Sequence, residues 1–204
     1  MGKQLAIFIS YLFHPLWMPL YVMLIFWNIN TKAMFISNDV VWLYILLVVF
    51  INTLLIPVLL FWMMKRLNII ESLHLDSQKD RFYPFAIIGI FYLTTWYVFS
   101  RLEIFTYLSL VFVIAAILVF LALAINLFWK ISIHSMSMGA MSIAVLYLTA
   151  VHFIDAAWPV YLVFIMSGLV GYARLKLKAH SSSQVYVGFV LGMLAVTIFF
   201  FSLL

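Results

Sequence analysis

Apolar residues in this chain form seven long runs separated by short polar segments. The runs cover residues 4–28, 40–64, 84–100, 104–129, 135–151, 157–173 and 184–204. A helix needs about 20 residues to cross the hydrocarbon core of a bilayer, and the third, fifth and sixth runs are the shortest. The pattern therefore predicts an all-α, polytopic transmembrane bundle of six to seven spans. His14-Pro15 and Pro19 predict a kink in the first span.

The composition supports the same class. With 68% hydrophobic and 8% charged residues, the 204-residue chain has too little polar surface to cover a soluble globule of its size. We expect one domain over residues 1–204, with no attached soluble domain. The absence of cysteine excludes a disulfide, a thiolate nucleophile and a sulfur-ligated metal site.

None of the runs contains a charged residue away from its ends, which argues against an ion-coupled transporter and places any chemistry at the membrane interface. Alternating seven spans across the membrane puts nine of the eleven basic residues on one face. The nine are Lys3, Lys65, Arg66, Lys79, Arg81, Lys130, Arg174, Lys176 and Lys178, and the two opposite are Lys32 and Arg101. The excess of positive residues predicts that this face is cytoplasmic. Because the basic residues flank apolar runs, the expected partners are a bilayer and an anionic lipid, and not a nucleic acid.

Three polar clusters on that face each precede a run. They are residues 79–84 (KDRFYP), 130–139 (KISIHSMSMG) and 174–184 (RLKLKAHSSSQ). Since helical hairpins separate them, all three are expected to meet. Free N–H groups at helix N-termini, together with the arginines, predict a site that attracts a phosphate. Ser135 and the serine run 181–183 are the expected helix caps.

The third cluster carries the most specific motif. Five residues separate Arg174 from His180, and Gly188 and Gly192 follow on the same predicted helix. This order resembles the type 2 phosphatidic acid phosphatase superfamily, whose third signature is Ser-Arg, five residues, His, three residues, Asp. Gln184 stands here in place of that aspartate. An alternative interpretation of the two glycines is that they permit close helix packing.

The resemblance extends over about residues 79–192. Ser132 and His134 match the serine and histidine of the second signature, Pro-Ser-Gly-His. Arg81, with a proline three residues later, resembles a loosened form of the first signature, which is lysine, six residues, Arg-Pro. His74 occupies the place of its lysine, and Lys79 is close enough to substitute.

The resemblance implies a metal-independent membrane lipid phosphatase without a cofactor. His180 would attack phosphorus to form a phosphohistidine, while His134 would protonate the leaving oxygen and then activate water. Gln184 would orient the imidazole of His180. The residues expected to bind the phosphate oxygens are Arg81, Arg174, Ser132 and Lys79. Phosphatidylglycerol phosphate, phosphatidic acid and polyprenyl diphosphate are all compatible substrates.

The resemblance also implies an integral protein of a bacterial inner membrane. Many bacterial relatives act on the outer side of that membrane, whereas the charge bias here predicts the cytoplasmic side. The sequence leaves the oligomeric state open.

Gln184 keeps a second function open, because a glutamine oxygen can orient a ring N–H but brings no charge. A lipid-phosphate binding or flipping protein would retain the arginines without hydrolysis. Alternatively, Glu71, Asp76 or Asp80 on the same face supplies the missing charge. Haem ligation by the two site histidines is disfavoured, because they lie among cations at helix ends and not in an apolar bundle core.

Other polar residues are expected to be structural. His14 is predicted to be a hydrogen-bonded core histidine beside the kink, and His152 with Asp155 to be interfacial on the opposite face. Apolar residues recur every third position over 67–73, which predicts a helix lying on the membrane just before His74.

Overall fold

The computed structural model describes residues 2–28, 39–73, 75, 77–101, 106–151 and 157–202. These residues form helices and turns, with no β-strand among them. Among the described residues, seven helices are long and apolar enough to cross a membrane, which confirms the seven runs and the all-α class. They are Lys3–Trp27, Asp39–Arg66, Lys79–Arg101, Leu108–Asn126, Ile133–Ala150, Trp158–Lys176 and Ser182–Phe201.

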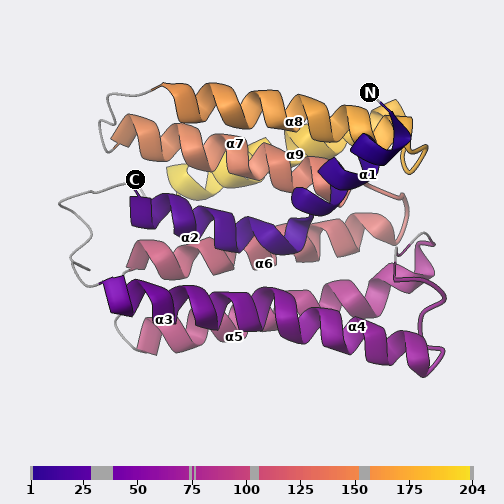
Figure 1. Cartoon of the computed structure of the whole chain (residues 1–204), viewed down its shortest axis with the longest axis horizontal. Helices are drawn as coiled ribbons and strands as arrows, with labels where there is room; N and C mark the ends of the chain where they lie inside the picture. Colours follow the sequence, from indigo (N-terminus) through magenta and orange to yellow (C-terminus); the bar gives the residue numbers. More distant parts are fainter. Residues whose placement is uncertain are drawn as a thin grey trace. The chain divides into compact units, whose positions relative to one another are not determined.

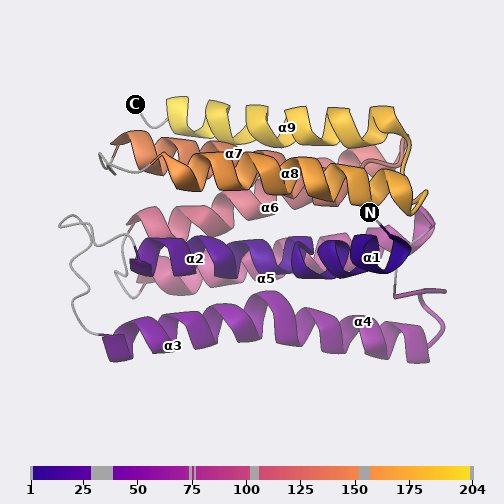
Figure 2. The same ribbon diagram turned by 45° about the horizontal axis from the view of Figure 1, so that its top comes forward.

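The chain divides into two compact units. Unit 1 contains Met1–Met18 and Lys130–Leu204, and unit 2 contains Pro19–Trp129. The helices of unit 1 are α1 (Lys3–Leu12), α7 (Ile133–Val151), α8 (Trp158–Lys176) and α9 (Ser182–Phe201). Within unit 1, α7, α8 and α9 lie side by side, and α1 packs on α8 (Figures 1 and 2).

Glycines bring α7 and α9 into close contact. A Cβ added to Gly192 of α9 would collide with the carbonyl oxygen of Met136, and one added to Gly139 of α7 would collide with the backbone of α9. A Cβ on Gly188 would lie 2.8 Å from the carbonyl oxygen of Ser132. The packing interpretation of Gly188 and Gly192 is therefore confirmed, and it fixes the start of α9 against the start of α7.

The first span breaks where the sequence predicted a kink. Helix α1 ends at Leu12, a 3₁₀ turn η1 covers Pro15–Trp17, and α2 (Met18–Asn28) continues the span. His14 is extended, with φ −67° and ψ 139°, because a residue before proline is disfavoured in helical conformation. Its Nδ1 accepts a hydrogen bond from the backbone N–H of Leu16 at 3.3 Å and so caps η1.

Unit 2 is built from helical hairpins. Helices α3 (Asp39–Phe50) and α4 (Ile56–Arg66) form one long span joined by a π-helical turn η2 (Ile51–Leu55), and α5 (Phe82–Arg101) packs against α6 (Thr106–Asn126) (Figure 2). Pro57 explains the π-helical turn, because proline has no N–H to donate to the carbonyl of Thr53 one helical turn earlier.

The predicted surface helix over residues 67–73 is wrong, since these residues form turns and bends. Asn68 ends α4 in a left-handed conformation with φ 55°, and Ile69 N–H donates to the carbonyl of Met64 at 2.9 Å. This hydrogen-bond pattern is a Schellman stop, which directs the chain away from the helix axis. The spacing of apolar residues was misleading because Ile70 is buried within the turn.

Candidate functional site

The spacing between Arg174 and His180 is produced by a tight corner between α8 and α9. Ala179 N–H donates to the carbonyl of Arg174 at 3.2 Å, and Lys178 N–H donates to that of Leu175 at 3.0 Å. Lys178 has φ 53°, so the two bonds form a Schellman motif that ends α8. Arg174 thus lies in the last turn of α8, and His180 comes two residues before the first residue of α9.

A capping box then starts α9. Ser181 is the N-cap, which confirms the expected cap in the serine run: its Oγ accepts from Gln184 N–H at 3.4 Å, and its own N–H donates to Gln184 Oε1 at 3.1 Å. The same Oε1 lies 3.1 Å from Nδ1 of His180. Gln184 therefore serves the helix cap and the imidazole with one oxygen.

This shared oxygen determines the tautomer of His180. Since the Ser181 N–H must donate, the atom that it meets is the amide oxygen of Gln184, and His180 Nδ1 must also donate to it. In a neutral imidazole with a proton on Nδ1, the lone pair lies on Nε2. His180 is buried, so its ring is held in one orientation with the lone pair on Nε2.

Helix α7 begins next to the start of α9. Ser132 N–H donates to the carbonyl of Gln184 at 3.3 Å, and Ser132 Oγ accepts from Ser135 N–H at 3.4 Å. Ser132 is thus the cap of α7, and the prediction of Ser135 as the cap is wrong. The bond to Gln184 fixes the chain at Ser132, so the helix starts three residues earlier than expected. Ser135 instead bonds the Ser132 hydroxyl, Oγ to Oγ, at 3.0 Å.

His134, in the first turn of α7, is buried and held by the first span. Its Nε2 lies 3.2 Å from the carbonyl oxygen of Ser10. A carbonyl only accepts, so Nε2 donates, and the lone pair of the neutral ring lies on Nδ1. Among the described residues, Nδ1 of His134 has no hydrogen-bond partner. His134 also lies within electrostatic range of Arg174, His180 and His14.

His14 packs against this histidine. The two rings meet edge to face, with centroids 5.1 Å apart and an interplanar angle of 88°. His14 is hydrogen-bonded as predicted, but its side chain is half-buried and not in the core, and its contact with His134 was missed. The available signal was the polar pair Ser10 and His14, four residues apart within an otherwise apolar run.

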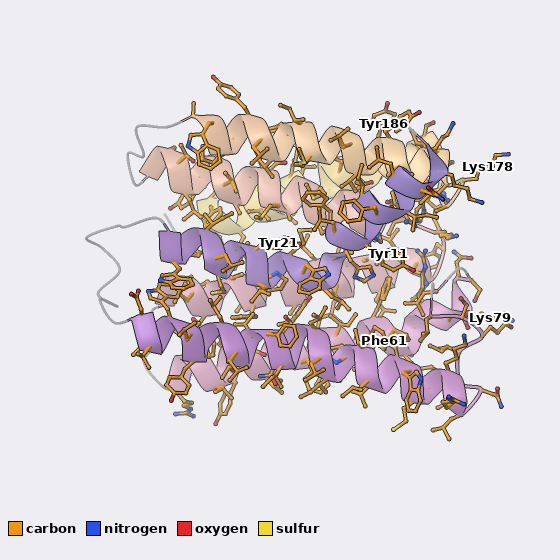
Figure 3. All side chains as sticks on the ribbon, viewed as in Figure 1. Tyr11, Tyr21, Phe61, Lys79, Lys178 and Tyr186 are labelled. Atoms are coloured by element: carbon orange, nitrogen blue, oxygen red, sulfur yellow. The ribbon has the colours of Figure 1, made fainter. Side chains whose placement is uncertain are left out.

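Unit 1 thus brings together the second and third polar clusters. His134, His180 and Arg174 gather where α7 and α9 begin and α8 ends, with Ser132 and Gln184 holding the two helix starts. Two imidazole lone pairs and a guanidinium beside two helix N-termini are suited to nucleophilic attack on, and proton transfer to, a bound anion. Lys176 and Lys178 are exposed at the same corner, where Figure 3 shows Lys178 pointing outward.

The first polar cluster belongs to unit 2 and organises a loop there. Arg81 is buried, and its Nε donates to the carbonyl of Leu75 at 2.9 Å. Asp80 is also buried, and its Oδ1 accepts from Glu71 N–H at 3.1 Å. Lys79 is exposed and points outward in Figure 3. The structure therefore gives Arg81 and Asp80 a role in shaping the connection between α4 and α5.

Several predicted positions lie outside the described residues. They are Lys32, His74, Asp76, His152 and Asp155. Within the part of the chain that the structure describes, no group of three or more His, Cys, Asp or Glu side chains is placed to hold a metal ion.

Over the residues that the structure describes, the fold is helical, with seven helices long and apolar enough to cross a membrane, and unit 1 holds buried histidines and serines together with the half-buried Arg174. Comparisons of the chain with protein families, with curated proteins and with solved structures gave no match.

Proposed function

We propose that this chain is a metal-independent membrane lipid phosphatase that hydrolyses a phosphomonoester or a diphosphate of a lipid through a phosphohistidine. The hydrogen bond between Nδ1 of His180 and Oε1 of Gln184 is the observation that carries the proposal. It leaves the lone pair on Nε2, which is the form that a nucleophilic imidazole needs. The resemblance of the motifs around Ser132, His134, Arg174 and His180 to the type 2 phosphatidic acid phosphatase superfamily supports the same chemistry.

In the first step, Nε2 of His180 attacks phosphorus and forms a P–N bond while the P–O bond to the lipid breaks. The leaving oxygen takes the proton from Nδ1 of a protonated His134, so the lipid departs as an alcohol or a shorter phosphate. Arg174 and the hydroxyl of Ser132 bind the non-bridging oxygens as charge develops on them. The N-terminal dipoles of α7 and α9 act in the same direction.

In the second step, neutral His134 accepts a proton from water at Nδ1 as the water oxygen attacks phosphorus. The P–N bond breaks, its electron pair returns to Nε2 of His180, and inorganic phosphate leaves. Nδ1 of His180 keeps its proton throughout and donates it to Oε1 of Gln184, so the ring is ready for the next turnover. Atoms and charges balance without a metal ion or a cofactor.

A lipid is the favoured substrate because the cluster lies at the ends of helices that are apolar enough for a membrane. A phosphate at headgroup depth would reach the cluster while the acyl or prenyl tail stays between helices. Exposed Lys176 and Lys178 at the corner favour an anionic membrane surface. The excess of basic residues on the face that holds them favours the cytoplasmic side of a bacterial inner membrane.

The test is phosphate release by purified protein from phosphatidylglycerol phosphate, phosphatidic acid and polyprenyl diphosphate, with and without a chelator. We expect release from at least one of the three that resists the chelator and falls to background in His180→Ala. Thr149→Ala, which removes a hydroxyl bonded within α7 at 2.8 Å from the carbonyl of Val145, is the matched control and should retain activity. Activity that survives His180→Ala would refute the proposed nucleophile.

One observation favours a second candidate function, a lipid-phosphate binding or flipping protein without hydrolysis. The amide oxygen of Gln184 accepts a hydrogen bond from His180, but it brings no negative charge to stabilise His180 as a cation. Transbilayer movement of a fluorescent lipid phosphate in reconstituted vesicles, without release of phosphate, would favour this second function over the first.

A further inference from the structure

The corner between α1 and η1, residues 10–16, reaches the same buried cluster as α7 and α9. Ser10 presents its carbonyl oxygen to Nε2 of His134 at 3.2 Å, and His14 places its ring edge to face with that of His134. The break at Pro15 makes this geometry possible, because it turns His14 out of the helical path of α1. A segment of the first span is thus packed against a residue 124 positions away.

Two contacts restrict the ring of His134. The Ser10 carbonyl fixes the proton of the neutral ring on Nε2, because a carbonyl can only accept. The His14 ring, whose plane lies at 88° to that of His134, limits rotation about the terminal side-chain bond. His134 is buried, so few alternative orientations fit. Only Nδ1 is then left to exchange a proton with a bound molecule.

We infer that His14, together with the carbonyl of Ser10, is a positioning residue that holds His134 with Nδ1 directed at the leaving oxygen of the substrate. The inference deepens the proposed function and rests on it. His14 itself neither attacks phosphorus nor transfers the proton. The Nδ1 proton of His134 passes to the leaving oxygen as the P–O bond breaks, while the proton on Nε2 stays there and is donated to the carbonyl of Ser10.

Two substitutions separate the two features of His14. His14→Asn keeps a side-chain acceptor for Leu16 N–H, and asparagine is a favoured helix cap, but it removes the ring that faces His134. His14→Phe keeps an aromatic ring at this position but removes the acceptor. A purely structural role predicts that His14→Phe is the more harmful change. The positioning role predicts that His14→Asn is the more harmful change for the acid step.

Release of the leaving group in a single turnover reports the acid step directly, because it precedes the step in which His134 acts as a base. A lipid alcohol needs protonation as it leaves, whereas p-nitrophenolate leaves without it. General acid catalysis contributes about 10²- to 10⁴-fold, so partial misplacement of His134 should lower the single-turnover rate of lipid release by about 10-fold or more. On p-nitrophenyl phosphate, the same His14→Asn variant should lose less than about 3-fold in the single-turnover rate of p-nitrophenolate release, since the acid contributes little there. His14→Phe should lose less than about 3-fold on both substrates.

Equal losses on the two substrates, or no loss in His14→Asn, would overturn the inference and leave the proposed function standing. If wild type releases no phosphate from either substrate, the proposed function fails, and ¹⁵N NMR of imidazole-labelled protein then decides the positioning. We expect a His134 signal with the proton on Nε2 in wild type and a mixture of tautomers in His14→Asn. An unchanged His134 signal in His14→Asn would overturn the positioning role.

Discussion

The Gln184 oxygen that joins the helix cap to His180, the proposed nucleophile, makes Gln184→Glu the most informative substitution. Glutamate has the same reach as glutamine, so it can still accept from both Ser181 N–H and His180 Nδ1, which each lie 3.1 Å from Oε1. It adds a negative charge beside a ring that becomes cationic when Nε2 bonds to phosphorus. A carboxylate in the first turn of α9 is also favourable for the helix dipole.

The magnitude follows from the distance. Unit charges about 4 Å apart interact by about 4 kcal/mol at an effective dielectric constant of about 20. Gln184 is half-buried, so solvent screening reduces this value, and burying part of the new carboxylate offsets some of the remainder. A net stabilisation of the transition state of about 1.4 to 2.8 kcal/mol corresponds to a 10- to 100-fold increase in kcat.

The assay is the initial rate of phosphate release at saturating lipid phosphate, compared between wild type, Gln184→Glu and Gln184→Leu. Leucine removes both hydrogen bonds while keeping a side chain of similar size. It should lower kcat and should also destabilise the start of α9 by about 1 kcal/mol, the usual cost of a lost cap. An unchanged kcat in both folded variants would refute the reasoning, because it would mean that the orientation of His180 does not depend on this oxygen.

Three further predictions concern stability and the α4–α5 connection. Lys178→Gly should raise the free energy of unfolding by about 1 kcal/mol, because a non-glycine residue at φ 53° is strained. Thermal unfolding should show this as a higher midpoint, and the control Lys178→Ala should show no such increase. Gly192→Ala should lower the free energy of unfolding by about 1 to 3 kcal/mol, because the added methyl group would collide with the backbone of α7. The control Gly168→Ala adds a methyl group that meets no atom within 4 Å, so it should be tolerated. Arg81→Ala should accelerate limited proteolysis between residues 67 and 78, because it removes the bond to Leu75. Loss of phosphatase activity with unchanged proteolysis would instead support the prediction that Arg81 binds phosphate.

Local patterns predicted the features of the fold that depend on neighbouring residues. Run length gave the seven spans, because each apolar run must be long enough to cross the hydrocarbon core. The His14-Pro15 pair gave the kink, because proline restricts the residue before it. The serine run gave the start of α9, because a serine cap bonds to a backbone N–H only a few residues later, whereas the reciprocal bond of Gln184 in the capping box was not predicted.

Features that depend on distant contacts were missed. The bond between Ser10 and His134 uses a backbone carbonyl, which every residue has, so no side-chain pattern announces it. Ser132 replaced Ser135 as the cap because its backbone is tied to Gln184, 52 residues later. The helix expected over residues 67–73 failed because Asp80 and Arg81 bond to the backbone of the loop and favour turns.

The π-helical turn in the second span has a consequence for which side of that span is covered. Val49, Thr53, Pro57 and Phe61 are all buried and follow one another at intervals of four residues. Four residues of α-helix advance about 400°, so three such steps would drift about 120° around the axis. Each residue of the wider turn at Ile51–Leu55 rotates less about the helix axis, which reduces this drift and keeps the four buried positions closer to one stripe. Deleting Asn52 would take away about 100° of rotation, but a return to ordinary winding would regain most of that angle, so the second half of the span would keep nearly the same covered side.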